Sequence, residues 1–263
     1  MIITSESALR PPAEQSVRTL ARGLTVLSVF DHANPSMRAA DVAARAGLNR
    51  AATARLLRTL VQLGYVRCQG EKFALTHQAL ELGHGYLSGS PMVLASRQGV
   101  EWLTGEFKEP CTAGVLAGGD VICIAATRVP GMIRAGLTVG ARIPAHASSM
   151  GKVLMAGLSE DEFSAALADS QFSRLTEQTI DSTERFRLEI EQVRRQGYAV
   201  NDSELQSGHR TVSVPVRGAA GAVLAAVGVN MLATPDTLQT ATAAHLPTLR
   251  RAAERIAERC TRV

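Results

Sequence analysis

The amino-terminal fold is decided by residues 37–75, which read MRAADVAARAGLNRAATARLLRTLVQLGYVRCQGEKFAL. The alanine-rich segment 39–46 predicts a compact helix, and Gly47 suits the left-handed position that often follows a helix. Asn49 can cap the next helix by accepting a hydrogen bond from its first free N–H groups. Gly64 ends that helix, and segments 65–68 and 72–75 predict a hairpin with its tip at 69–71. This order of elements is that of a winged helix-turn-helix.

The charge distribution supports this interpretation. Residues 1–90 contain ten Arg or Lys and six Asp or Glu, whereas the other 173 residues contain eighteen of each. The whole formal net charge of +4 therefore belongs to the first third of the chain. From Arg50 to Arg67 there are four arginines and no acidic residue, as expected of a surface that binds the phosphates of duplex DNA.

The second helix of the motif has two distinct faces. Its core face is expected to consist of residues that recur at spacings of three and four: Thr53, Leu56, Leu57 and Leu60. The residues expected to meet DNA lie on the outer face or on neighbouring elements: Arg50, Ala51, Ala54, Arg55, Arg58, Arg67, Arg45 and Lys72. Within this set, the arginines early in the helix would donate to guanine and the alanines would touch thymine methyl groups. Arg58 and Arg67 would hold phosphates, whereas Lys72 and Arg45 can equally be solvated surface charges.

Composition limits the class of protein. The 263 residues are 46% hydrophobic but only 4% aromatic, so ample cores are expected and any ligand cavity would be lined by aliphatic and methionine side chains. No segment reaches the roughly 18 to 20 apolar residues that span a bilayer, which predicts a cytoplasmic protein without membrane partners. The four cysteines have no paired spacing, so we expect buried, reduced thiols and neither a metal site nor a disulfide framework.

Further helices flank the predicted DNA-binding motif. Ser16 can cap a first helix, whose apolar stripe consists of Val17, Leu20, Leu24, Leu27 and Phe30. Thr76 is placed to cap a connecting helix that runs to about Leu87, where the segment 88–91 breaks it. We therefore predict a winged helix-turn-helix domain at 1–75, ordered from about residue 16, a linker helix at 76–90 and a second domain at 91–263.

The second domain has an α+β pattern. Helices are expected at 92–107, 149–158, from a capping box at Ser159 onward, at 183–196 and at about 235–259. Strands are expected at 112–117, 121–126, 133–137, 198–200, 210–216 and 223–229. Helices that flank a meandering antiparallel sheet suggest a GAF-like sensor domain.

Nearly the whole chain resembles the IclR family of bacterial transcriptional regulators. In the first domain the resemblance is carried by segments 16–30, 41–43, 47–48, 55–57 and 60–66, and in the second by the stretches PAHASSMGKVL at 144–154 and RRQGY at 194–198. Segments 80–83, 86–87, 148–151 and 214–216 are most similar to the branch that senses aromatic acids such as protocatechuate and 4-hydroxybenzoate. Departures are His209, which replaces an aliphatic residue, and the alanines at 51, 52 and 54, which replace polar ones.

The resemblance implies a palindromic operator bound by a dimer or tetramer, and a small-molecule effector. The start of the helix near Ser149 fits a carboxylate, because its backbone N–H groups are free and Ser148 and Ser149 add hydroxyl groups; these serines can equally be simple helix caps. The family pocket maps onto Met132, Ala135, Ile143, Ser149, Met150, Asn201, Thr211, Gly228 and Asn230, with Arg134 as a countercharge.

The alternative is a small-molecule-converting enzyme with a basic accessory domain. The segment 146–153 superficially resembles a phosphate-binding loop, but its first glycine is replaced by His146 and Val153 supplies no hydroxyl for magnesium. The chain has no G-x-S-x-G, H-E-x-x-H or C-x-x-C motif, and its histidines lack the spacing of metal ligands. We therefore expect a regulator that needs no cofactor and catalyses no reaction.

Overall fold

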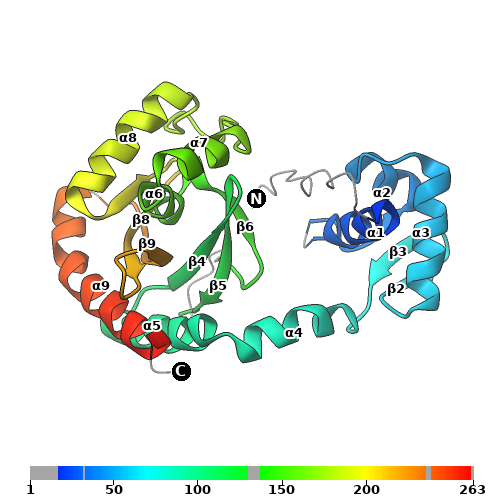
Figure 1. The fold of residues 1–263 in the computed structure, drawn as a ribbon, viewed down its shortest axis with the longest axis horizontal. Helices are drawn as coiled ribbons and strands as arrows, with labels where there is room; N and C mark the ends of the chain where they lie inside the picture. The colour runs from blue at the N-terminus through cyan, green and yellow to red at the C-terminus, as the bar shows by residue number, and fades with distance from the viewer. Residues whose placement is uncertain (1–16, 32, 130–136, 235–237, 262–263) are drawn as a thin grey trace. The chain divides into compact units, whose positions relative to one another are not determined.

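The computed structural model describes residues 17–31, 33–129, 137–234 and 238–261 and contains two compact units, which divide between Tyr86 and Leu87 (Figure 1). The division falls within helix α4 (Ala79–Gly89), which occupies most of the predicted linker at 76–90. The first unit is the winged helix-turn-helix, and the second is a six-stranded antiparallel sheet with helices on both faces. The predicted α+β fold class is confirmed.

Within its described residues, the first unit contains three helices before the start of α4 and a three-stranded sheet. Its elements are α1 (Arg18–Ser28), β1 (Met37–Arg38), α2 (Ala39–Arg45), α3 (Arg50–Gln62), β2 (Val66–Gln69) and β3 (Lys72–Leu75). The predicted hairpin is present, and β1 adds a third strand that pairs Met37 with Phe73. We did not predict β1, because two residues are too few to show an alternating pattern.

Capping explains where the helices of this unit begin. The Asn49 side-chain oxygen accepts a hydrogen bond from the Ala52 backbone N–H at 2.8 Å, as predicted, and Gly47 has a φ of 63° in the tight turn before it. The prediction for Thr76 is met in part: its hydroxyl accepts from the Gln78 backbone N–H at 3.2 Å, as a cap does, but it also donates to the Gly64 carbonyl at 2.5 Å. Helix α4 itself begins three residues later, at Ala79. Ser16, the predicted cap of α1, lies outside the described residues, and α1 starts without a side-chain cap.

The predicted stripe of α1 exists, but most of it faces solvent in the single chain. Val17, Leu20 and Leu24 are 70%, 63% and 45% exposed, whereas Val26 and Phe30 are buried in the core of the unit. The sequence pattern identified which positions of α1 are apolar, but it did not show whether they pack in the core of the unit or lie on its surface. An apolar face of this kind on a small domain indicates contact with another surface.

The second unit is built around one sheet with the strand order β6-β5-β4-β9-β8-β7. The strands are β4 (Cys111–Ala117), β5 (Asp120–Ala126), β6 (Arg142–Pro144), β7 (Ala199–Asp202), β8 (His209–Arg217) and β9 (Val223–Leu232). The helices are α5 (Pro91–Phe107), α6 (Ser149–Ala156), α7 (Glu160–Ala168), α8 (Thr183–Gln196) and α9 (Leu238–Thr261). Most of the strand predicted at 133–137 lies outside the described residues.

Two apolar cores lie on the opposite faces of this sheet. Helices α5 and α9 pack together on one face, where Val100, Leu103 and Ile256 are buried. Helices α6, α7 and α8 cover the other face, with Phe163 and Phe186 stacked between α7 and α8 (Figure 1). The second core is the one that positions α6 over the strands.

The cysteines differ from the prediction at two positions, since Cys68 is exposed and Cys260 is only partly buried. Cys111 and Cys123 are buried, and burial raises the pKa of each thiol to about 12, so both are un-ionised at neutral pH. Cys68 is exposed on β2, because the wing strand has solvent on one side.

His146 lies at the entrance to α6, in the short 3-10 turn η1 (Ala145–Ala147). Its side chain is 1% exposed, its Nε2 lies 3.2 Å from the Ser173 carbonyl oxygen, and its ring packs against Phe172. Because a carbonyl oxygen only accepts hydrogen bonds, Nε2 carries the proton of a neutral imidazole. Burial lowers the pKa of His146, so the folded state disfavours the imidazolium form.

This burial predicts a loss of stability in acid. Below the ordinary histidine pKa of about 6.5, the unfolded chain binds a proton that the folded chain resists, until the pH falls through the lower pKa of folded His146. The free energy of unfolding should fall by up to about 1.4 kcal/mol per pH unit in this window. Urea unfolding of the wild type and of His146→Phe between pH 7.5 and 5 tests this, and equal slopes for the two proteins would contradict it.

Candidate DNA-binding and effector sites

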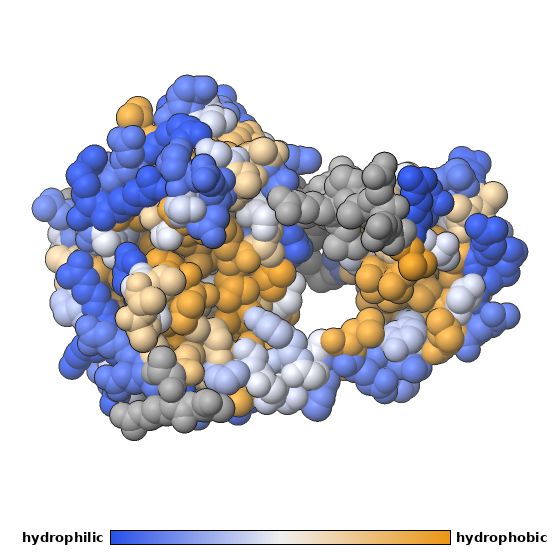
Figure 2. All heavy atoms as spheres, viewed as in Figure 1, coloured by the Kyte–Doolittle hydropathy of each residue, from blue (hydrophilic) through white to orange (hydrophobic). Residues whose placement is uncertain are grey.

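The predicted DNA contacts gather on α3 and on the wing of the first unit. Arg50, Arg55 and Arg58 are exposed on α3, as is Ala51, while Ala54 is half-buried between them. Arg67 and Lys72 are exposed on β2 and β3. Hydrophilic side chains cover much of the α3 surface that Figure 2 shows. Small residues between the arginines leave the helix narrow enough for its backbone to approach a groove.

Arg45 differs from the other predicted contacts. Its guanidinium lies 3.0 Å from the Asp31 carboxylate, and 31% of its side chain is exposed. Burial tends to raise the pKa of Asp31, but hydrogen bonds from Asn34 and the charge of Arg45 outweigh this and lower it. The ion pair joins α2 to the end of α1, so Arg45 already has a structural partner. Among the predicted contacts, it is the least available to a phosphate.

Four predicted effector residues lie on neighbouring strands and share one face of the sheet. In the strand register, Asn201 of β7 is paired with Thr211 of β8, and Thr211 with Asn230 of β9. The next row on this face contains Gly228, which is paired with Ser213 on one side and Thr112 on the other. Two adjacent polar rows, each on three neighbouring strands, therefore reach four strands in total.

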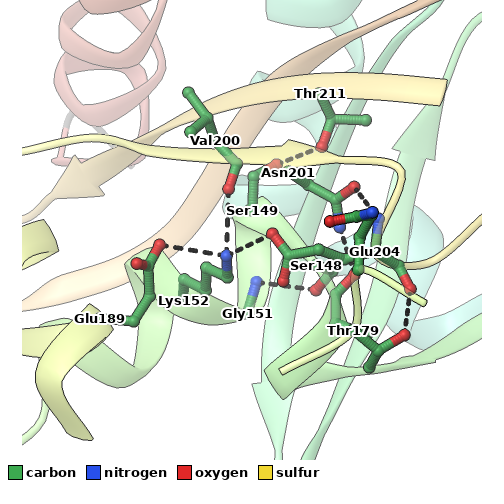
Figure 3. Close-up of polar contacts among 12 residues, drawn as sticks. Ser148, Ser149, Gly151, Lys152, Thr179, Glu189, Val200, Asn201, Glu204 and Thr211 are labelled. Atoms are coloured by element: carbon green, nitrogen blue, oxygen red, sulfur yellow. Dashed lines mark hydrogen bonds and ion pairs between the residues drawn. The ribbon is translucent and has the colours of Figure 1, made fainter. Parts of the chain in front are cut away.

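The start of α6 lies over these rows. The Ser149 hydroxyl is 2.6 Å from the Thr211 hydroxyl and 2.8 Å from the Ser213 hydroxyl. Ser148 is the N-cap of α6, since its oxygen accepts from the Gly151 backbone N–H at 3.0 Å. The two serines thus have different roles. Ser148 closes the helix end, and Ser149 connects it to the sheet (Figure 3).

A second contact between α6 and the sheet lies beside the first. Thr112 of β4 donates to the Met150 sulfur at 3.8 Å and accepts from the Asn230 amide at 3.2 Å. Position 228 requires a glycine, because a Cβ atom there would lie 2.2 Å from the Ser213 hydroxyl oxygen. The missing side chain leaves space for that hydroxyl. The structure therefore brings Ser149, Met150, Thr211, Gly228 and Asn230 together.

Sequence reasoning missed Thr112 and Ser213. The signal was present, since Ser213 is two residues from Thr211 and a strand presents alternate residues on one face. Ile143 is 2% exposed and belongs to the apolar core around α6, so it borders these rows as a packing residue. The predicted contacts Met132, Arg134 and Ala135 lie outside the described residues.

Behind the start of α6 lies a buried ionic cluster. The Lys152 side chain is 2% exposed, and its Nζ lies 2.6 Å from a Glu204 carboxylate oxygen, 3.1 Å from Glu189 and 3.2 Å from the Val200 carbonyl (Figure 3). Burial raises the pKa of Glu204 more than the charge of Lys152 lowers it. Its second oxygen, Oε2, is buried and accepts no hydrogen bond from the described residues. Sequence reasoning did not bring these residues together, because they are far apart in the chain.

The chain matches two family descriptions that cover both units. Residues 19–70 match the IclR helix-turn-helix domain, and residues 84–258 match the C-terminal domain of the bacterial transcriptional regulator IclR. The chain belongs to the IclR family. It is a transcriptional regulator with a DNA-binding domain and an effector-binding domain, and not an enzyme, so the alternative of a converting enzyme is set aside.

Individual relatives confirm the narrower resemblance to regulators of aromatic catabolism. The Pca regulon regulatory protein of Pseudomonas putida is 34% identical over 81% of this chain and 73% of its own length. The p-hydroxybenzoate hydroxylase transcriptional activator of Acinetobacter baylyi is 30% identical over 82% of this chain and 84% of its own. The inducer-binding domain of the Acinetobacter transcription factor PobR, solved as a double mutant with 3-hydroxybenzoic acid, is 26% identical with a TM-score of 0.57, covering 62% of this chain and 95% of that one.

Among the described helices, none combines the length and the apolar composition needed to cross a bilayer.

The hydroxyl contacts at Ser149 generate a test of the effector site. A leucine at this 1% exposed position would fill the space between α6 and the polar rows, so Ser149→Leu should abolish the response of DNA binding to effector. Ser149→Ala removes only the hydroxyl and should weaken effector binding by about 0.5–1.5 kcal/mol. Calorimetry and DNA-binding titrations measure both effects. Dose-response curves identical to wild type in both variants would remove Ser149 from the site.

Proposed function

We propose that the protein is a cytoplasmic regulator that binds a palindromic operator as a dimer or a dimer of dimers and responds to a small aromatic carboxylic acid. The observation that carries this proposal is the pair of polar rows beneath the start of α6, in the domain that matches the IclR C-terminal family. The relative solved with 3-hydroxybenzoic acid supports the ligand class.

Effector recognition follows from the chemistry of these rows. A carboxylate near the start of α6 would be attracted by the backbone N–H groups of the helix and by the hydroxyls of Ser149, Thr211 and Ser213. A phenolic hydroxyl needs a polar partner at a distance from the carboxylate, and Asn201 and Asn230 lie along the same row. Arg134 remains a predicted countercharge.

DNA recognition would divide between base contacts and phosphate contacts. Arg50 and Arg55 lie in the amino-terminal half of α3, the part of a recognition helix that meets base edges. Arg58, Arg67 and Lys72 are exposed further along α3 and on the wing, where cations neutralise phosphates and release counterions. One helix reads only a few base pairs, so a symmetric dimer on a palindrome supplies the remaining specificity.

Two exposed apolar faces fit a dimer contact within the first unit and its linker. The stripe of Val17, Leu20 and Leu24 on α1 is one of them. The other is on α4, where Leu82 and Tyr86, one turn apart on the helix, are 57% and 52% exposed. Burial of such side chains stabilises association by about 25 cal/mol per Å² of apolar surface. We propose that a second copy of the chain covers them.

An effector changes DNA affinity only through its different affinities for two conformations of the protein. Typical coupling free energies are about 1–3 kcal/mol, which corresponds to roughly 5- to 150-fold in DNA affinity. A screen of 4-hydroxybenzoate, protocatechuate and non-aromatic acids such as pyruvate, by calorimetry and by DNA binding, tests the ligand class. Binding of the non-aromatic acids alone would overturn the aromatic assignment and leave the regulator intact.

The arrangement of α3 predicts the effect of removing Arg55. Arg55→Ala should lose a base contact worth roughly 1–3 kcal/mol and so abolish discrimination between operator and random DNA at that position, while effector binding is unchanged. Operator and random duplexes titrated in parallel measure this. Wild-type operator affinity in this variant would refute our orientation of α3.

Arg58→Ala is the matched comparison for Arg55→Ala. It should weaken binding to all sequences alike and reduce the slope of log affinity against log salt by about 0.9, because one phosphate contact is lost. An unchanged salt slope together with altered sequence preference would instead place Arg58 at the base edges.

The exposed stripe of α1 predicts a change of oligomeric state. Leu20→Glu places a charge in the proposed contact and should shift the protein toward monomer and weaken binding to the palindrome more than to a half-site. Sedimentation measurements and half-site titrations check this. If Leu20→Glu is as oligomeric as a Leu188→Glu control, which changes an exposed residue of α8, the α1 contact is wrong.

A further inference from the structure

The ionic cluster behind α6 contains two carboxylates that contact the same buried cation. Figure 3 shows the Lys152 side chain between Glu189, which comes from α8, and Glu204, which follows β7. The Glu189 side chain is 24% exposed and Glu204 is 10% exposed, whereas Lys152 is 2% exposed. The cation is therefore neutralised from two sides, and its neighbours differ in how much solvent reaches them.

Glu204 has connections that lead to the proposed effector site. Its backbone N–H donates to the Asn201 side-chain oxygen at 3.2 Å, and its carbonyl accepts from the Thr179 hydroxyl at 2.7 Å. The Asn201 amide in turn donates to the Ala147 carbonyl, directly before the N-cap Ser148. A continuous series of contacts thus runs from Lys152 to Glu204, from Glu204 to Asn201, and from Asn201 to the start of α6. Since Lys152 itself lies on α6, the series begins and ends at the same helix.

The segment after β7 requires such an anchor. Ser203 has a φ of 63°, a left-handed conformation that is unfavourable for a residue with a side chain. The next residue, Glu204, is held by the lysine and by Thr179, and this fixes the direction in which the chain leaves β7. A buried ion pair contributes little net stability but holds its groups in one geometry, because any other geometry leaves a charge without a partner.

We propose that the Lys152–Glu204 ion pair is a positioning element that sets effector affinity without contacting the effector. The pair holds Asn201 and the start of α6, which carries Ser149, in the geometry that binds the acid. This inference rests on the proposed function, since it assigns a role around the same site. It predicts that the two carboxylates on Lys152 are not equivalent, because Glu204 is joined to Asn201 and Glu189 lies on α8.

The test compares Glu204→Gln with Glu189→Gln. Each variant removes one charge beside Lys152 and keeps the shape of the side chain. The first measurement is amide hydrogen exchange of segments 145–152 and 199–205 without ligand. The second is calorimetry with 4-hydroxybenzoate and with protocatechuate. Urea unfolding and operator binding without ligand complete the comparison, and both variants should keep wild-type operator affinity.

The expected result is specific to Glu204. In Glu204→Gln, the amide hydrogens of both segments should exchange faster than in the wild type. Its affinity for the acid should be roughly 2- to 30-fold lower than that of the wild type. The affinity of Glu189→Gln for the acid should remain within about twofold of the wild-type affinity. If the pair serves only the stability of the fold, both variants lower the urea midpoint and leave ligand affinity unchanged, and this outcome overturns the proposal.

A double variant keeps the test decisive if Glu204→Gln folds poorly. Lys152→Met/Glu204→Met replaces the pair by apolar side chains of similar length, an exchange that folded proteins often tolerate. This variant should retain the fold. Its amide hydrogens at 145–152 and 199–205 should exchange faster than those of the wild type, and its affinity for the acid should be lower. Wild-type exchange and affinity in the double variant would overturn the proposal.

Failure of the proposed function has a different signature. If the wild type binds neither aromatic acid, the ligand class is wrong, and hydrogen exchange alone decides the positioning role. Faster exchange in Glu204→Gln and not in Glu189→Gln then supports that role, and equal exchange in the two variants overturns it.

Discussion

A helix that begins with polar residues is stable against an apolar sheet only when each buried polar group finds a partner. Helix α6 meets this condition through Ser149, which contacts two strand hydroxyls, and through Lys152, whose charge is balanced by Glu204 and Glu189. These contacts act together with the apolar core around α6 to hold the helix on the sheet. Helix α8 and the segment after β7 are both held to α6 by Lys152.

The same condition connects architecture with regulation. A set of partnered hydroxyls beneath a helix can exchange its internal hydrogen bonds for hydrogen bonds to a ligand of matching chemistry at little net cost. A ligand that does so changes what holds α6 to the sheet. Family membership establishes that this domain binds an effector, and we propose that the polar rows mark the face on which it binds.

Much of the fold was predictable from local sequence signals. Asn49 and Ser159 cap the helices that they were expected to cap, and α8 has the predicted limits, because a cap and a glycine stop act over a few residues. Thr76 was predicted only in part: its hydroxyl accepts from the Gln78 N–H near the start of α4, but it also donates to the Gly64 carbonyl, twelve residues earlier in the chain. The α1 stripe was recognised, but periodicity does not distinguish a core from a surface that another protein covers. The Glu204 contact with Lys152 spans 52 residues and is visible only in three dimensions.

Among the described residues, the six-stranded sheet ends in two short edge strands, β6 and β7. β6 has three residues and ends in Pro144, which cannot donate a backbone hydrogen bond, and β7 has four residues and ends in the charged Asp202. Short edges of this kind offer little for strand addition, so the sheet resists being extended from one molecule to the next. Assembly is then left to helical surfaces, which protects the regulator from the edge-to-edge aggregation to which open sheets are prone.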